Sequence, residues 1–96
     1  MYVLVTYDVS TSDEGGARRL RRVAKLCCQH GQRVQHSVFE CLLDPAQYEY
    51  LKHELGNVID KSCDSLRFYN LGKRWQGRIE HLGVDGTYDP EGLLFI

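Results

Sequence analysis

The stretch that decides the fold is RVQHSVFECLLDP, residues 33–45. Its apolar and polar residues predict two short strands, about Arg33–Gln35 and Val38–Leu43, which meet at a tight corner at His36-Ser37. Within the second strand, one face carries Phe39, Cys41 and Leu43 and the other carries Val38, Glu40 and Leu42. Asp44-Pro45 then predicts a helix start, because Asp caps free backbone N–H groups and Pro suits the first helical position.

The segments on either side complete an element order of β-α-β-β-α-β. Tyr2–Val9 is almost wholly apolar and rich in β-branched residues, which predicts a central strand buried on both faces. A helix over about Ala17–Gln29 follows, with apolar residues at helical spacing. The helix that opens at Pro45 has its own apolar stripe, formed by Tyr48, Leu51, Leu55, Val58 and Ile59. Ser65–Leu71 is predicted to form a further strand.

This order predicts an α+β, ferredoxin-like fold, with an antiparallel four-stranded sheet and both helices on one face. Ile79–Leu82 is expected to add a short fifth strand, so that residues 1–82 form the domain and residues 83–96 a C-terminal tail. The bare face of such a sheet needs cover, and the C-terminal elements could pair with the edge of a second copy. We therefore expect a homodimer, with the tail contributing to its packing.

The composition is that of one small globular domain. The chain has 96 residues, of which 43% are apolar and 26% charged, and both values are typical of globular proteins. No apolar run approaches the roughly 20 residues that span a bilayer, which argues against a membrane partner. The N-terminus lacks a basic segment and soon meets Asp8, so it does not resemble a signal peptide. We expect a cytoplasmic protein.

In a chain without an export signal, four cysteines are expected to stay reduced: Cys27, Cys28, Cys41 and Cys63. A zinc site that combines the first two with His30 and His36 is conceivable, but this spacing matches no standard zinc motif. The simpler interpretation is that the thiols are small apolar fillers of a helix and two strands.

Positive charge is concentrated at the first helix, although the whole chain has a net charge of −1. Residues 1–40 carry a balance of +2 and residues 41–96 a balance of −3. Five of the six cations in the first part fall within Arg18–Lys25, and no acidic residue lies between Ala17 and Gln32. This distribution favours a local surface that binds anions.

The arginines of the first helix are the candidates for contacts with nucleic acid: Arg18, Arg19, Arg21 and Arg22. Arg presents a planar fork of donors that suits phosphate, although a solvated helix face is the general alternative. Arg33 and the Lys73-Arg74-Trp75 cluster, with Arg78 nearby, could extend the surface. Trp75 could stack on a base or pack in an interface.

Asp8 ends the first strand, where a loop begins, and is the candidate metal ligand. Mg²⁺ is often held by one or two carboxylates together with water and phosphate. One Asp per chain provides few ligands for such a site, but the same residue from the two copies of a two-fold dimer could converge on one ion. The structural alternative is that Asp8 caps the Ser10-Thr11 turn. His36, beside Ser37, is a candidate proton-transfer group.

Four segments together resemble the CRISPR-associated protein 2 family, the small adaptation protein that partners the CRISPR integrase. They are YDV at Tyr7–Val9, RLRRVAK at Arg19–Lys25, RVQHSVFEC at Arg33–Cys41 and DSLRFY at Asp64–Tyr69. The third segment is the most specific, and the resemblance spans residues 1 to about 82.

The resemblance implies a ferredoxin-like homodimer in which Asp8 faces its twin and binds Mg²⁺. It implies a metal-dependent endonuclease on RNA or duplex DNA, or a scaffold that grips DNA and bridges copies of the integrase, CRISPR-associated protein 1. By motif position, the candidate catalytic or binding residues are Asp8, Tyr7, Ser37 and Phe39, with Arg19, Arg21 and Arg33.

Functions from other classes also remain open. A free-standing RNA-cleaving toxin could use the same fold. A small-molecule or metal-sensing dimer is conceivable, but no Gly-rich phosphate loop or metal-binding spacing supports it. An RNA-recognition module is disfavoured because the aromatic strand motif of that module is missing.

Overall fold

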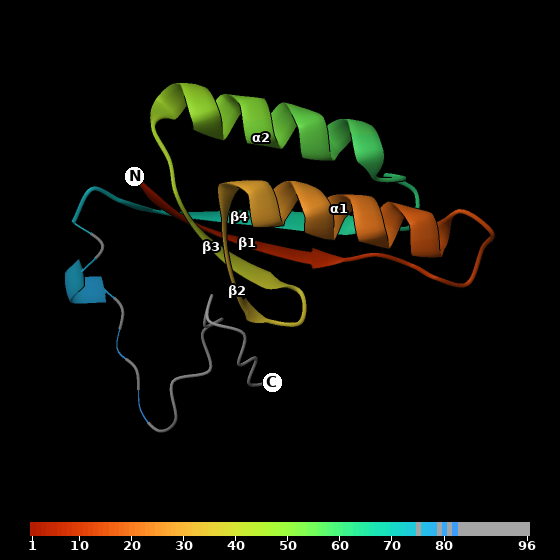
Figure 1. Ribbon diagram of the computed structural model, residues 1–96, viewed down its shortest axis with the longest axis horizontal. Helices are drawn as coiled ribbons and strands as arrows, with labels where there is room; N and C mark the ends of the chain where they lie inside the picture. The colour runs from red at the N-terminus through yellow and green to blue at the C-terminus, as the bar shows by residue number, and fades with distance from the viewer. Residues whose placement is uncertain (75, 79, 81, 83–96) are drawn as a thin grey trace.

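Both helices lie on one face of a four-stranded sheet in the computed structural model, which describes residues 1–74, 76–78, 80 and 82 (Figure 1). The elements in chain order are β1 (Tyr2–Asp8), α1 (Gly16–His30), β2 (Gly31–Gln35), β3 (Val38–Leu42), α2 (Pro45–Val58), β4 (Ser65–Gly72) and a 3₁₀ turn, η1 (Gln76–Arg78). The α+β order and the antiparallel four-stranded sheet expected from the sequence are confirmed.

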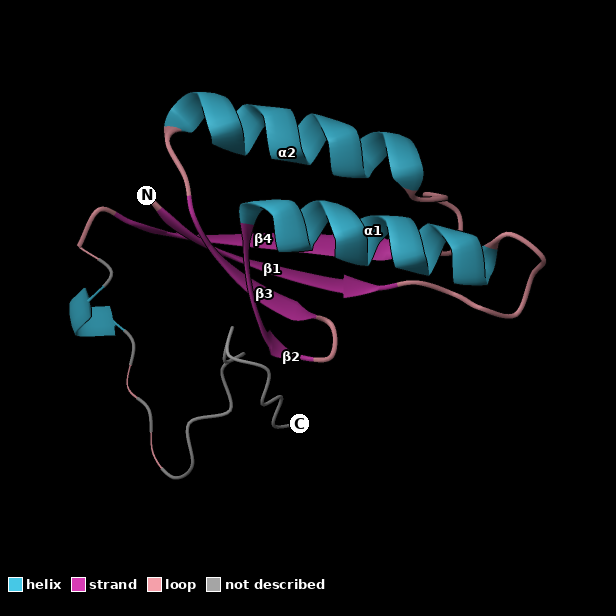
Figure 2. Ribbon diagram, in the orientation of Figure 1, coloured by secondary structure: helices cyan, strands magenta, loops and turns pink. Residues whose placement is uncertain are grey.

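β1 lies inside the sheet, whose strand order is β2-β3-β1-β4. It pairs antiparallel with β3, where Val5 lies opposite Phe39, and with β4, where Asp8 lies opposite Ser65. This order makes β1 a central strand, as predicted, and Figure 2 shows both helices on one side of the strands.

The side chains of β1 alternate between a covered face and an open face. Val3 and Val5 are buried toward the helices, whereas Leu4 and Thr6 are half-buried and Asp8 is exposed on the opposite side. The expectation that this strand is buried on both faces is therefore wrong for a single chain, because both helices pack on the same face. We call the side that carries Leu4, Thr6 and Asp8 the open face of the sheet.

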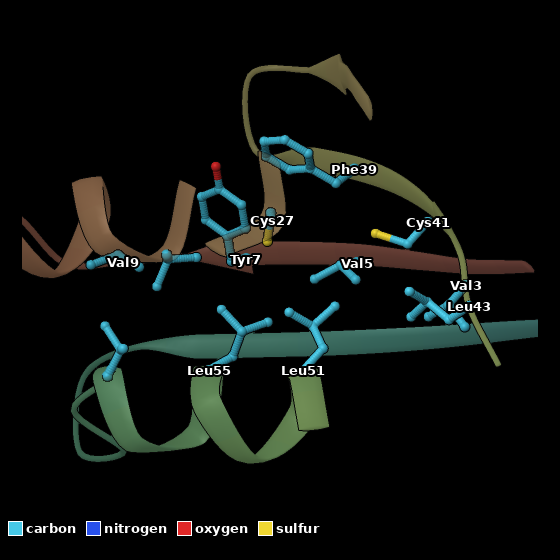
Figure 3. Packing of buried hydrophobic residues seen from close by; sticks show 12 residues of the cluster. Val3, Val5, Tyr7, Val9, Cys27, Phe39, Cys41, Leu43, Leu51 and Leu55 are labelled. Atoms are coloured by element: carbon cyan, nitrogen blue, oxygen red, sulfur yellow. The ribbon is translucent and has the colours of Figure 1, made fainter. Parts of the chain in front are cut away.

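The core fills the space between the helices and the covered face of the sheet (Figure 3). Its largest fully buried side chains are Phe39, Leu51, Leu55, Val3, Val5, Val23, Cys27 and Cys41. Full burial of a Val, Leu or Phe side chain contributes about 1.5–3 kcal/mol. These residues confirm two predictions. Phe39 and Cys41 show the alternation predicted for β3, and Leu51 and Leu55 belong to the apolar stripe predicted for α2.

Local chemistry fixes where the two helices begin. At α2, the Gln47 N–H donates to Asp44 Oδ1 at 2.7 Å and the Asp44 N–H donates to Gln47 Oε1 at 2.9 Å. This reciprocal cap confirms the predicted start at Pro45. At α1 no side chain among the described residues caps the helix, and a Cβ at Gly16 would collide with the backbone of Ser10. Gly16 therefore lets α1 pack tightly against the loop that follows Asp8.

Element bounds differ from the sequence expectations by one or two residues. β2 begins directly after α1 at Gly31. This glycine lies against the Glu40 carbonyl and Cys41, where a Cβ would not fit. The predicted fifth strand, Ile79–Leu82, and the tail of residues 83–96 fall wholly or partly outside the described residues, as does Trp75. Among the helices that the structure describes, none is long and apolar enough to cross a membrane.

Candidate functional site

Asp8 lies on the open face at the end of β1, the position expected from the sequence. Its side chain is exposed and borders a shallow hollow of about 300 Å³. The hollow is lined by Thr6, Tyr7, Asp8, Ser65, Arg67 and Tyr69. On β4, the Arg67 guanidinium donates to the Tyr69 hydroxyl at 3.4 Å. A carboxylate and a guanidinium thus share one open hollow.

The groups around Asp8 are of the kind that Mg²⁺ prefers. The hollow offers the Asp8 carboxylate and the hydroxyls of Thr6 and Ser65, all of them hard oxygen donors. The described residues of one chain supply one carboxylate here, and a second copy on the open face would supply another. The donor set fits a Mg²⁺ ion that keeps several of its waters and contacts few protein groups.

A second acidic group lies in the loops that flank α1 and α2. Asp13, Asp60 and Cys63 each place a ligand atom within 4.8 Å of the others, and all three are exposed. The thiol is a soft ligand that does not suit Mg²⁺, and the Arg19 guanidinium lies 3.1 Å from Asp13 Oδ2. The thiol and the nearby positive charge make this group a poorer Mg²⁺ site than the hollow at Asp8.

Tyr7 and Phe39, two of the catalytic candidates, direct their rings to the covered face. The rings stack with their centroids 6.1 Å apart (Figure 3), and Phe39 is 0% and Tyr7 6% exposed. Tyr7 precedes Asp8 in the chain, but successive side chains of a strand point to opposite faces. The two rings and the Asp8 carboxylate therefore lie on opposite sides of the sheet.

Arg33 contacts the Phe39 ring, and Ser37 contacts the Tyr7 backbone. We call these four residues, Tyr7, Arg33, Ser37 and Phe39, the packed corner. The Arg33 guanidinium lies 5.0 Å from the Phe39 ring centroid, a cation–π contact, and its buried Nε has no hydrogen-bond partner within the described part of the chain. The Tyr7 N–H donates to the Ser37 carbonyl at 3.2 Å, and the Tyr7 hydroxyl donates to the His36 carbonyl at 3.4 Å. Burial raises the pKa of Tyr7 more than the Arg33 charge lowers it, so the phenol stays protonated at neutral pH.

Four cations of the basic segment, which we call the basic row, are exposed on α1: Arg18, Arg21, Arg22 and Lys25. This is the arrangement expected for the polar side of an amphipathic helix. Arg22 and Lys25 also line an open groove of about 440 Å³ between α1 and α2. The basic row is therefore accessible to an anionic partner.

Arg19 differs from the basic row because its guanidinium is occupied within the chain. Its Nε donates to Asp64 Oδ2 at 2.8 Å, and its Nη2 donates to Asp13 Oδ2 at 3.1 Å and to the Ser10 carbonyl at 3.3 Å. The Arg19 side chain is 16% exposed. Binding of nucleic acid by Arg19, as the sequence suggests, would have to compete with these protein acceptors.

Asp64 is the residue of this network that sequence reasoning missed. Its side chain is 0% exposed, and its carboxylate also accepts the N–H groups of Ser10 at 3.0 Å and of Asp60 at 2.8 Å. Burial raises the pKa of Asp64, but hydrogen bonds from Arg19 and from the two amides outweigh burial and lower the pKa to about 2. No spacing rule connects Asp64 with Arg19, which lies 45 residues earlier in the chain.

We expect acid to weaken the fold through Asp64 between about pH 4 and pH 2. The pKa in the folded state lies below the ordinary value of 3.8, so the stabilisation is complete above that pH and disappears as the pH falls through about 2. Urea denaturation of the wild type and of Asp64→Asn over this range measures the effect. The gap in unfolding free energy between the two proteins should shrink toward pH 2, and a constant gap would contradict the stabilising role of this charge.

The cysteines are free thiols, as expected. Cys27 and Cys41 are fully buried in the core, where burial raises the pKa of Cys27 to about 12 and that of Cys41 to about 11. Cys28 and Cys63 are exposed, so the prediction that all four are buried fillers is wrong for these two. Cys28 lies one residue after Cys27 on α1, and that step of the helix turns it away from the core.

The comparison with known proteins assigns the chain to a family. A family model for CRISPR associated protein Cas2 matches residues 1–79, and the chain belongs to that family. The CRISPR-associated endoribonuclease Cas2 of Nitratidesulfovibrio vulgaris is 57% identical over 96 residues, which cover 100% of this chain and 94% of the relative. The CRISPR-associated endonuclease Cas2 of Halalkalibacterium halodurans is 53% identical over 94 residues, covering 98% of each chain.

Solved structures agree with this assignment. The crystal structure of Streptococcus pyogenes Cas2 at pH 6.5 matches with a TM-score of 0.74 and 59% sequence identity. The match covers 86% of this chain and 100% of that chain. The resemblance drawn from the sequence segments is therefore confirmed.

Proposed function

We propose that this Cas2-family chain is a Mg²⁺-dependent endonuclease that acts as a homodimer on phosphodiester bonds of RNA or duplex DNA. The names of the relatives, endoribonuclease and endonuclease, support this class of reaction. The observation that carries the proposal is the exposed Asp8 carboxylate at the end of the central strand, in a hollow that also contains Arg67. A carboxylate for a metal and a guanidinium for phosphate suit phosphodiester hydrolysis.

A second copy on the open face would complete the site. Leu42 is 64% exposed and Tyr69 44% exposed on the strands beside β1. Such side chains on an uncovered sheet favour contact with another protein surface. Residues that lie close to a two-fold axis meet their own copies, so an axis that passes near Asp8 would bring the two Asp8 carboxylates together and supply the second one.

The residues of the hollow have distinct roles in this proposal. When bound, Mg²⁺ would activate water and neutralise charge on the scissile phosphate. Asp8 would hold the ion through its carboxylate, and Arg67 would donate hydrogen bonds to phosphate oxygens. Tyr69 offers a ring on which a base could stack. The packed corner, which contains the other three catalytic candidates, would act from the covered face by holding the end of β1.

The basic row supports a second role that is compatible with the first. Its four exposed cations suit the backbone of duplex DNA. We propose that the dimer also scaffolds the CRISPR integrase, CRISPR-associated protein 1, on DNA in the cytoplasm during spacer acquisition. Co-purification with the integrase supports this role, and failure to associate at any salt concentration contradicts it. A stand-alone toxin instead predicts growth arrest on expression that Asp8→Ala abolishes.

The nuclease is tested by cleavage of labelled single-stranded RNA and labelled duplex DNA, each in Mg²⁺ and in EDTA. We expect the wild-type protein to cut at least one substrate in Mg²⁺ and neither in EDTA. Cutting that is equal in both conditions would contradict a metal-dependent mechanism. Absence of cutting in both would leave the scaffold as the better account of the chain.

A further inference from the structure

Arg19 and Asp64 form a clamp around Ser10, two residues beyond Asp8. The Ser10 N–H donates to Asp64 Oδ1 at 3.0 Å, and the Ser10 carbonyl accepts a hydrogen bond from Arg19 Nη2 at 3.3 Å. Arg19 Nε and Asp64 Oδ2 are themselves 2.8 Å apart. One ion pair, in which the Asp64 side chain is 0% exposed, thus holds both backbone polar groups of Ser10.

The clamp also fixes the segment opposite Asp8. Asp64 directly precedes Ser65, which pairs with Asp8 across β1 and β4. The Asp64 carboxylate accepts the Asp60 N–H at 2.8 Å, so the loop that enters β4 is anchored to the same side chain. A buried charge with this many hydrogen bonds has few alternative arrangements. The clamp therefore constrains both the loop after Asp8 and the residue opposite it.

We infer that Arg19 and Asp64 are positioning residues that hold the Asp8 carboxylate where the proposed metal site needs it. This inference rests on the proposed function; it adds Asp64 to the machinery and gives Arg19 a positioning role in place of a contact with nucleic acid. Neither residue lines the hollow, so both act through the backbone and neither has to touch the substrate. A displacement of about 1 Å in a reacting group can lower a rate by about 100-fold. Loss of the clamp should therefore be visible at Asp8 itself.

The test compares the wild type with Asp64→Asn and with a matched control, Asp13→Asn. Both variants remove one carboxylate that binds Arg19, but Asp13 is 47% exposed and binds the guanidinium from its outer side. Three quantities are measured: the Mg²⁺ concentration for half-maximal cleavage, the KM for RNA, and the hydrogen-exchange rates of backbone amides. The amides of residues 8–10 report on the clamp, and those of α2 report on intact folding.

We expect Asp64→Asn to raise the required Mg²⁺ concentration about tenfold and to speed exchange at residues 8–10. The KM for RNA should not change, and Asp13→Asn should stay within about twofold of the wild type. Exchange in α2 should speed up only by the factor that the lower free energy of unfolding predicts, and less than exchange at residues 8–10. If Asp64→Asn does not fold, Arg19→Lys carries the test, because lysine keeps the charge but loses the planar fork. It should raise the Mg²⁺ requirement in the same direction.

An unchanged Mg²⁺ requirement in a folded Asp64→Asn protein would overturn the inference, and so would an equal effect of Asp13→Asn. A raised KM for RNA at an unchanged Mg²⁺ requirement would also overturn it, because Arg19 would then be a nucleic-acid contact. If the wild type does not cleave at all, the proposed function fails on its own. The exchange rates at residues 8–10 then decide whether the clamp orders this segment. Faster exchange in Asp64→Asn supports the clamp, and unchanged exchange refutes it.

Discussion

Asp8→Asn should lower Mg²⁺-dependent cleavage by at least about 100-fold, which corresponds to about 2.7 kcal/mol of transition-state stabilisation. The amide keeps the shape of the side chain but lacks the charge that holds a divalent cation. Because Asp8 is exposed on the open face, the free energy of unfolding should stay within about 0.5 kcal/mol of the wild type. Initial cleavage rates and urea denaturation measure the two quantities.

Glu14→Gln is the matched control for this substitution. Glu14 is also exposed, and its substitution removes the same charge outside the hollow. The control should cut at the wild-type rate. Undiminished cutting by Asp8→Asn would instead make Asp8 a structural residue and leave the scaffold as the better account of this chain.

Phe39→Ala should lower the free energy of unfolding by about 3–5 kcal/mol. The ring is 0% exposed, stacks with Tyr7 and packs against the Arg33 guanidinium. Its removal leaves a cavity and takes away the cation–π partner of Arg33. Small domains have about 5–15 kcal/mol of stability in total, so cleavage should fall because much of the protein unfolds on warming. Urea denaturation at low temperature measures the change.

Phe39→Leu separates packing from catalysis at the same position. Leucine keeps much of the apolar volume, so this variant should lose about 1.5 kcal/mol or less. It should remain folded and cut close to the wild-type rate. A folded Phe39→Leu protein without activity would show that the ring itself takes part in the reaction, which would contradict its assignment to the core.

The secondary structure could be predicted because its signals are local. The Asp44-Pro45 pair marks a helix start by the chemistry of capping, and the alternation over Val38–Leu42 marks a strand with one buried face. The prediction for Tyr2–Val9 was wrong in one respect, since an apolar run does not tell which face the same chain covers. Leu4 and Thr6 belong to a face that the helices leave open, so the apolar side chain of Leu4 is available to a partner outside the single chain.

A site residue could be predicted only where its place within a single strand or helix sets it apart in the sequence. Asp8 ends an apolar strand, and that pattern is visible in the sequence. Arg67 was missed because it reaches the hollow at Asp8 through the pairing of β1 with β4. Asp64 was missed because its contact with Arg19 joins residues 45 positions apart. Strand register depends on which faces are buried and on loop geometry, and neither is encoded near these residues. Tyr7 shows that neighbours in the chain can be far apart in function: it precedes Asp8, but its side chain points to the opposite face of the sheet.

Counting bound ions tests the central claim of a site shared by two copies most directly. Mn²⁺ can replace Mg²⁺ for this purpose, and its free concentration can be measured by electron paramagnetic resonance during a titration. The shared site predicts one tightly bound ion for every two chains in the wild type, and loss of that ion in Asp8→Asn. One ion for every chain, or binding that survives Asp8→Asn, would contradict it.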